Sequence, residues 1–467
     1  MTRSVTWRRL ALSLSMLVLL AACGTGGEPD TDDAEPDVDD TEDVDEDADD
    51  PDGEDADDAD GEDAIDDEDT ELSGEITFTT LQLSPDFDEY LEGVIADFEA
   101  EHPEVEVQWT DLPFEGAQER LLADASAGTL ADVVNLNPDL AFPLASEGEF
   151  VDLDDAGADV RDDYVEGAWD SFRYPGMDGA YGYPWYLSTE VTMYNTALLE
   201  EAGLDADDAP ETFDELFDTA RAVAENTDAR GMHPALENRF VIDLVKLGVD
   251  ITDEDATQAT FNTPEAVAHV EELVSLYEDG AVSPDAVTEG HRQEIEAYQA
   301  GNIALFPSGP NFLNIIEENA PDIAETTQAA PQIEGPAGVT GMSVMGLMVP
   351  ESTENPDAAH AFAQYMTNEE NQLAFAEETL IFPSIVAALE DPMFTEPDED
   401  GDFAEAISVA AAQLPDAANL RPVVVDDEVN NAIISNVQSA MLGDMTPEDA
   451  LADAEDEVDA ILERRTE

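Results

Sequence analysis

The stretch Glu75-Ile76-Thr77-Phe78-Thr79-Thr80 is rich in β-branched and aromatic residues and predicts a strand at the start of the folded part of the chain. The segment that follows carries apolar residues at helical spacing: Leu91, Val94, Ile95 and Phe98. His102-Pro103 ends this predicted helix, because a residue before proline disfavours the helical conformation. A strand followed at once by an amphipathic helix is typical of α/β folds.

Two further strands are predicted downstream, with a helix through Leu121 and Leu122 between them. Val105-Glu106-Val107-Gln108-Trp109 alternates in polarity, and Asp132-Val133-Val134-Asn135-Leu136 has the composition of a buried strand. Strands that alternate with helices predict a largely parallel sheet covered on both faces. Ligands of such sheets bind beyond the carboxyl ends of the strands.

Helix starts are clearly marked in the second half of the chain. Thr212-Phe213-Asp214-Glu215 has the pattern of a capping box. Thr263-Pro264 and Thr446-Pro447 each place a capping residue before a proline, and the second pair begins a C-terminal helix through Ile461. A folded region of nearly 400 residues predicts two lobes rather than one.

The N-terminus has the features of an export signal. Arg3, Arg8 and Arg9 precede an apolar run, residues 10–20, that is too short for a permanent membrane span. Residues 20–24, Leu-Ala-Ala-Cys-Gly, resemble the lipobox of bacterial lipoproteins. The resemblance implies that residues 1–22 are a signal peptide and that Cys23, the only cysteine, is lipidated. A free or buried cysteine in a secreted protein is the alternative, and twin-arginine export through Arg8-Arg9 stays open.

An acidic segment, residues 23–72, follows the cysteine. From Glu28 to Glu71, 28 of 44 residues are Asp or Glu and none is basic. Such a segment cannot bury apolar surface, so it predicts a disordered tether. A flexible chain of this length spans roughly 35–40 Å. No window has the order of ligands of an EF-hand, so loose binding of counterions is expected rather than a structural calcium site.

The acidity continues beyond the tether. The net charge of −102 becomes −77 over residues 72–467 once the 28 tether carboxylates and the three N-terminal arginines are removed. Lys246 is the only lysine. This charge excludes nucleic acids and anionic lipids as electrostatic partners. It indicates a halophilic or salt-tolerant source, or a bias in genome base composition.

Several stretches together resemble the family 1 extracellular solute-binding proteins, the sugar-capturing subunits of ABC importers, to which maltose-binding protein belongs. They are residues 75–91, 130–139, 183–195 and 198–203, the turn Ser308-Gly309-Pro310-Asn311-Phe312, and residues 331–350 and 362–373. The resemblance covers the chain from Ser73 onward.

The resemblance implies an α/β fold of the type II periplasmic-binding-protein class, with two lobes and the ligand in the cleft between them. Lobe 1 is expected at residues 73–186 plus 338–370, and lobe 2 at residues 187–337 plus 371–467. Three crossings are expected near residues 185–189, 332–338 and 368–377. Closure about a hinge is the motion typical of such proteins.

The resemblance also transfers ligand positions in lobe 1 and the first crossing. The loop after the first strand gives Gln82 and Ser84, and the loop after the third strand gives Asp139, an acceptor for sugar hydroxyls, with Asn137 beside it. The first crossing gives three more positions, which are Trp185, Tyr186 and Ser188. Maltose-binding protein has a carboxylate at the position of Ser188, and this departure argues against maltose as the ligand.

Four positions transfer to lobe 2. Glu237 matches a ligand-binding glutamate. Arg239 and Asn311 stand where the family has stacking aromatic residues, and Phe312 could supply a face instead of Asn311. Hydroxyl-binding and aromatic side chains together suit a sugar. The aromatic residues could instead belong to the core and the carboxylates to the solvated surface.

The sequence therefore predicts a lipid-anchored solute-binding protein on the outer face of the membrane. Its partners would be a carbohydrate and the transmembrane subunits of an ABC permease, and it would act as a monomer without cofactor or metal. The histidines lack the paired spacing of a zinc site, and there is no Gly-x-Ser-x-Gly nucleophile motif. A glycoside-processing enzyme and a passive surface lipoprotein remain alternatives.

Overall fold

The computed structural model of the protein describes residues 72–466, apart from 157, 207, 380 and 397–401. The predicted signal peptide, Cys23 and all of the predicted tether except Leu72 lie outside the described residues. Within the described part, no helix combines the length and the apolar character needed to cross a bilayer.

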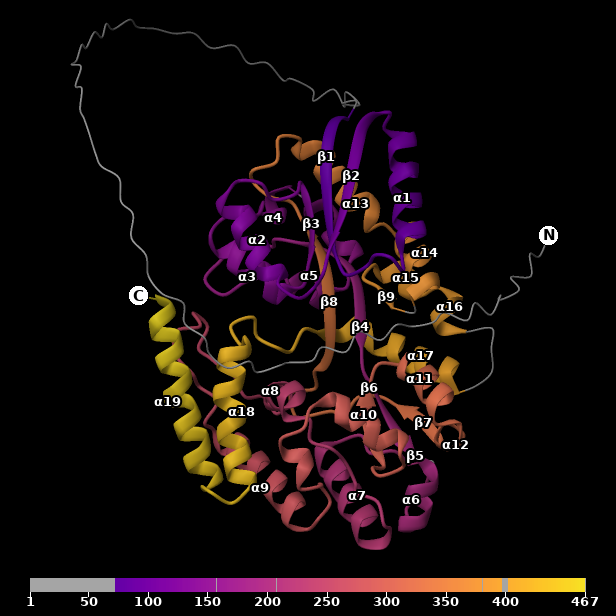
Figure 1. Ribbon diagram of the computed structural model, residues 1–467, viewed down its shortest axis with the longest axis vertical. Coiled ribbons are helices and arrows are strands. Elements are labelled where there is room, and N and C mark those ends of the chain that lie inside the picture. The colour runs from indigo at the N-terminus through magenta and orange to yellow at the C-terminus, as the bar shows by residue number, and fades with distance from the viewer. Residues whose placement is uncertain (1–71, 157, 207, 380, 397–401, 467) are drawn as a thin grey trace, which may run out of the picture. The chain divides into compact units, whose positions relative to one another are not determined.

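The strands form two sheets, a large one and a small one (Figure 1). The strands of the large sheet are β1 (Ser73–Leu81), β2 (Glu104–Leu112), β3 (Val133–Leu136), β4 (Tyr183–Thr189), β8 (Thr340–Met348), β9 (Phe382–Pro383) and β10 (Ala417–Ala418). The strands of the small sheet are β5 (Val191–Asn195), β6 (Leu305–Ser308) and β7 (Thr327–Ala330).

Helices surround both sheets. The helices that come before β5 or directly after β8 in the chain are α1 (Asp88–Glu101), α2 (Ala117–Ser126), α3 (Pro138–Ser146), α4 (Leu153–Ala156), α5 (Glu166–Asp170), α13 (Pro356–Met366), α14 (Glu369–Thr379), α15 (Val386–Leu389) and α16 (Pro392–Thr395). The others are α6 (Thr196–Ala202), α7 (Phe213–Asn226), α8 (Leu236–Lys246), α9 (Pro264–Glu278), α10 (His291–Gln299), α11 (Phe312–Asn319), α12 (Pro321–Ala324), α17 (Asp402–Gln413), α18 (Asp427–Met441) and α19 (Pro447–Thr466). The described residues also form the short 3-10 turns η1 (Ala158–Asp163), η2 (Asp285–Val287) and η3 (Leu414–Asp416).

The first three predicted strands and the helix between the first two are confirmed. The apolar stripe of α1 is buried, and Phe98 and Phe78 both pack edge-on against Phe362 of α13, with ring centroids 5.1 and 5.2 Å apart. β1 therefore lies in the core with α1 and α13 on the same face. The capping box of Thr212 with Glu215 is present, and Thr263 caps α9.

The prediction of a largely parallel sheet is wrong in part, because the large sheet is mixed. β1 pairs in parallel with β2 and β3, and β10 pairs in parallel with β8, but β8 is antiparallel to both β3 and β4, and β9 is antiparallel to β4. The small sheet is antiparallel throughout. The reason is that β4 and β8 carry the chain between the two sheets (Figure 1), so their direction is not set by strand-helix-strand crossovers.

The chain passes from the large to the small sheet at Glu190, between β4 and β5, and returns through residues 331–339, between β7 and β8. The third crossing does not lie at residues 368–377 as expected. Phe375 of α14 stacks on Trp185 of the large sheet, and β9 pairs with β4. The chain thus leaves the large sheet only after β9, and a lobe boundary at residue 371 is too early. The other lobe boundaries stay predictions.

Raising the concentration of sodium or potassium chloride from 0.01 M to 1 M is expected to stabilise the fold. The Debye length falls from about 30 Å to about 3 Å over this range, which screens the repulsion among surface carboxylates. We expect the melting temperature to rise by more than about 2–4 °C, the change that ~1 kcal/mol produces in domains of 150–250 residues. Calorimetry in both salts tests this, and a flat melting temperature would show that the acidity has no role in salt adaptation.

Candidate functional site

The loop after β1 presents two of the predicted ligand positions to solvent. Gln82 and Ser84 are both exposed, and Gln82 has a left-handed backbone with φ 54°. The carboxylate of Asp111, at the end of β2, holds this loop: its Oδ1 accepts from Thr80 Oγ1 at 2.6 Å and from the Leu83 backbone N at 3.0 Å. A polar loop is thereby fixed at the carboxyl edge of the large sheet.

Asn137 and Asp139 lie at the same edge, because β3 is paired in parallel with β1. The side chain of Asn137 is used to cap α3, where its Oδ1 accepts from the Leu140 backbone N at 3.0 Å. Asp139 follows in the first turn of α3 and is exposed. The structure thus brings together four predicted residues, of which Asn137 has a helix-capping role.

Asp139 faces the segment that leads into α18. Although Asp139 is exposed to solvent, the surrounding protein atoms partly desolvate its carboxyl group and raise its pKa; Arg421 lowers the pKa, and Asp427 and Asp426 raise it further. α3 and the segment that leads into α18 therefore interact electrostatically near Asp139. In the described part of the chain, Arg421 has no ion pair within 4 Å. Its Nε donates one hydrogen bond to the Val425 backbone O at 3.2 Å, and the rest of the guanidinium is available to a ligand.

Aromatic residues lie beside Asp139. Phe142, one turn further along α3, packs against two separate groups of buried apolar residues. The centroid of its ring lies 5.3 Å from that of Tyr174. Burial, reinforced by the charge of Asp139, raises the pKa of Tyr174. Among the described residues its hydroxyl has no hydrogen-bond partner. Tyr174 and Arg421 were not predicted from the sequence.

Phe114 was also missed. It lies in the loop after β2, and 45% of it is exposed, more than any other aromatic residue of the described part. The backbone N of Gln82 donates to Leu112 O at 2.8 Å, which ties the loop after β1 to this one. An exposed ring beside polar groups is the combination that sugars need.

Trp185 is not a ligand residue. Its side chain is fully buried, and its ring stacks on Phe375 with centroids 5.2 Å apart and planes 13° apart. This assignment is corrected because the indole lies on the face of β4 that α14 covers. Tyr186 is half-buried, with its ring 5.2 Å from that of Trp185, whereas Ser188 is exposed.

Arg239 is engaged in a buried ion pair. Its Nη1 donates to both carboxylate oxygens of Glu294, at 2.9 and 2.8 Å, and its Nη2 donates to Pro307 O at 2.6 Å. Glu294 is fully buried and also lies 2.8 Å from His291 Nδ1. Arg239 therefore supports the turn after β6. The prediction that Arg239 contacts the ligand is wrong, because its side chain is engaged in this buried ion pair.

The remaining predicted residues of this part of the molecule are at the surface. Glu237 is exposed in the first turn of α8, and Asn311 is exposed in the turn that precedes α11. Phe312 is half-buried, and its ring packs edge-on against His291 and Phe306, at 5.7 and 6.0 Å between centroids. Glu237 and Asn311 thus stay available for a ligand.

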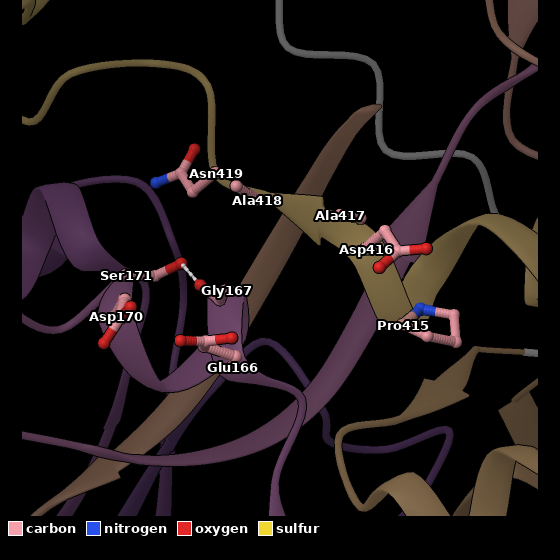
Figure 2. Close-up of a pocket in the computed structure, with 9 residues that line it drawn as sticks. All are labelled: Glu166, Gly167, Asp170, Ser171, Pro415, Asp416, Ala417, Ala418 and Asn419. Carbon is pink, nitrogen blue, oxygen red and sulfur yellow. Dashed lines mark hydrogen bonds between the residues drawn. The ribbon is translucent and has the colours of Figure 1, made fainter. Parts of the chain in front are cut away.

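A separate pocket of about 360 Å³ lies between α5 and β10 (Figure 2). It is lined by Glu166, Gly167, Asp170, Ser171, Pro415, Asp416, Ala417, Ala418 and Asn419. None of the predicted ligand residues lines it, and it offers no aromatic face to a sugar. The polar edge around Asp139 is the better candidate site.

Comparison with known proteins gives a consistent picture. Residues 84–373 match the family of bacterial extracellular solute-binding proteins. A structure from Synechococcus sp. MITs9220, provisionally assigned as an oligosaccharide periplasmic-binding protein, is 32% identical, covers 84% of this chain and 99% of its own, and superposes with a TM-score of 0.76.

Two further relatives have known ligands. The GacH receptor of Streptomyces glaucescens GLA.O, whose structures include a complex with acarbose, is 25% identical, with 84% of this chain and 99% of that chain covered and a TM-score of 0.65. An arabinooligosaccharide-binding protein of Halalkalibacterium halodurans is 24% identical over 385 residues, which cover 75% of this chain and 81% of the relative. The comparisons therefore confirm the two-lobed fold.

Proposed function

Since the chain belongs to the bacterial extracellular solute-binding proteins, we propose that it captures a mono- or oligosaccharide outside the membrane and delivers it to the permease of an ABC importer. The family match over residues 84–373 carries this proposal. The acarbose and arabinooligosaccharide ligands of the two relatives support carbohydrate as the ligand class.

The polar edge supports the same class. Asp139 can accept hydrogen bonds from hydroxyl groups, Gln82 can both accept and donate them, Arg421 adds a donor, and Phe114 offers an apolar face. The carboxylates of Asp139 and Asp427 outweigh the guanidinium of Arg421 near this edge, while the carboxylate of Asp426 is paired with Arg465. We therefore propose that the ligand is a neutral sugar rather than an acidic one.

Isothermal titration against a panel of neutral oligosaccharides and their uronic-acid counterparts tests this function. Binding of a neutral member, with the sugar recovered intact, is the expected result. Cleavage of the sugar would favour the glycoside-processing enzyme. Absence of binding to every member of a broad panel would favour a passive surface lipoprotein.

Asp139→Ala is expected to weaken binding of a verified sugar by about 1–3 kcal/mol, the cost of losing a hydrogen bond to a charged group. Asp357→Ala is a matched control, because the tripeptide Asn-Pro-Asp recurs at residues 355–357, where Asp357 is exposed in the first turn of α13. Asn355 Nδ2 donates to Glu75 O near the start of β1, so this copy lies at the opposite edge of the sheet. Equal dissociation constants for both variants would place the site elsewhere.

We also propose that Cys23 carries a lipid anchor. Cys23→Ala is expected to move the protein from the detergent phase to the aqueous phase after phase partition, because the acyl chains that hold it at the membrane are lost. Sugar binding should be unchanged. Thr25→Ala is the control and should stay in the detergent phase, and a Cys23→Ala protein that also stays there would contradict lipidation.

A further inference from the structure

The passages between the two sheets meet at one buried polar side chain. Gln332 lies in the return passage, residues 331–339, and is 8% exposed. Its Nε2 donates to Thr189 Oγ1 and to Gly341 O, both at 2.7 Å. Its Oε1 accepts from the Gly341 backbone N at 3.1 Å and from Lys246 Nζ at 3.0 Å. Both donors and both acceptor positions of this amide are therefore used.

These bonds join the two passages directly. Thr189 is the last residue of β4, immediately before the passage at Glu190, and its Oγ1 also donates to Gly341 O at 2.7 Å. Gly341 lies near the start of β8, at the end of the return passage. Gln332 and Thr189 thus bring the point where the chain leaves the large sheet against the point where it comes back.

The only lysine of the chain completes this arrangement. Lys246, at the end of α8, is 7% exposed, and its Nζ donates to Ile333 O at 3.0 Å in addition to Gln332. Burial lowers the pKa of Lys246, an effect that Asp243 and Glu190 partly offset. Gly335 passes so close to Lys246 that an added Cβ would lie 2.1 Å from the Lys246 backbone O. The return passage is therefore seated on the end of α8.

The segment after α17 is tied to the same point. The backbone N of Gln332 donates to Gln413 Oε1 at 2.8 Å, and Gln413 Nε2 donates to Glu190 O at 3.3 Å. β10 begins four residues after Gln413 and pairs with β8 at Gly341. Three segments that join the large sheet to the rest of the molecule, at Glu190, at residues 331–339 and at Gln413, are thus connected through Gln332.

We propose that Gln332 is the positioning residue of the hinge: it holds the passages at a fixed point about which the two lobes rotate when a ligand is enclosed. This inference rests on the proposed function only in one respect, which is that the rotation serves to enclose a sugar. A fully bonded, buried amide keeps its geometry independently of the acidic surface, because none of its partners is a carboxylate.

The chain offers a matched control in Gln372 of α14. Gln372 is 2% exposed, and its Nε2 donates to Thr367 O at 2.7 Å and to Ser384 Oγ at 2.9 Å, while its Oε1 accepts from the Ser384 backbone N at 2.5 Å. All of these contacts stay within the elements of the large sheet. Loss of this amide should cost stability without freeing the hinge.

The test measures the distance between the lobes without a sugar. The full chain with Cys23→Ala carries spin labels at Glu119→Cys on α2 and Glu225→Cys on α7, both exposed positions. Gln332→Leu is expected to broaden and shift the distance distribution from double electron–electron resonance. Gln372→Leu should leave it unchanged despite a lower melting temperature. An unchanged distribution for Gln332→Leu, or equal broadening for Gln372→Leu, would overturn the proposal.

Lys246→Met is the second variant, in case Gln332→Leu does not fold. It removes one acceptor contact of Gln332 and the bond to Ile333 O, and is expected to broaden the distribution less than Gln332→Leu. A distribution identical to that of the unmodified hinge would count against the proposal. Because no sugar is present, failure here is distinct from a failure to find a ligand by titration.

Discussion

Arg239→Met is expected to lower the free energy of unfolding by about 3–5 kcal/mol, the usual cost of leaving one partner of a buried ion pair without the other. Glu294 is the one acidic side chain that is buried among those the structure describes, and Arg239 supplies it with two hydrogen bonds. The bond from Arg239 to Pro307 O is lost as well, so the turn at Ser308 should lose its support and sugar binding should weaken.

Urea unfolding of the single and double variants measures this effect. Glu294→Leu added to Arg239→Met is expected to recover stability, because no buried charge is then left unpaired. An equal loss of stability in the double variant would contradict this account.

Trp185→Ala is expected to destabilise the fold by about 3–5 kcal/mol, because it removes a fully buried indole and leaves a cavity. The ring loses its stacking partner Phe375 and its contact with Phe78, 6.3 Å away between centroids. The affinity for a sugar should change much less than the stability does, provided that measurements are made where the variant is folded.

Trp109→Ala is the control for this substitution. Trp109 on β2 is only half-buried and its Nε1 donates to Thr80 Oγ1 at 2.9 Å, so its loss should cost less stability. A Trp185→Ala protein that melts like the unmodified protein but binds sugar far more weakly would return Trp185 to the ligand site.

The regular elements were predictable because their signals are local. The helical spacing of Leu91 to Phe98, and the capping pair Thr212 and Glu215, depend on neighbours within one or two turns. The direction of β8 was not predictable, because it depends on a partner more than 150 residues away: Ser188 pairs with Ser343 in an antiparallel register. Long-range pairing leaves no mark in the spacing of apolar residues.

The site was predictable only in part, for a related reason. Gln82 and Asp139 follow strands of a parallel pair, so their meeting at one edge follows from the fold class. Whether Trp185 faces a ligand or the core depends on which face α14 covers, and Arg239 depends on a distant carboxylate. Arg421 carried one usable signal: in a domain with so few basic residues, each basic residue is expected to have a specific role.

The burial of Lys246 has a chemical consequence. Reducing sugars react through their aldehyde form with primary amines to give Schiff bases, and lysine is the side chain that supplies such amines. The only lysine of this chain is 7% exposed and holds two hydrogen bonds. A protein that we propose to hold sugars therefore presents no lysine amine to them. Its described surface should resist glycation at lysine even in concentrated solutions of reducing sugar.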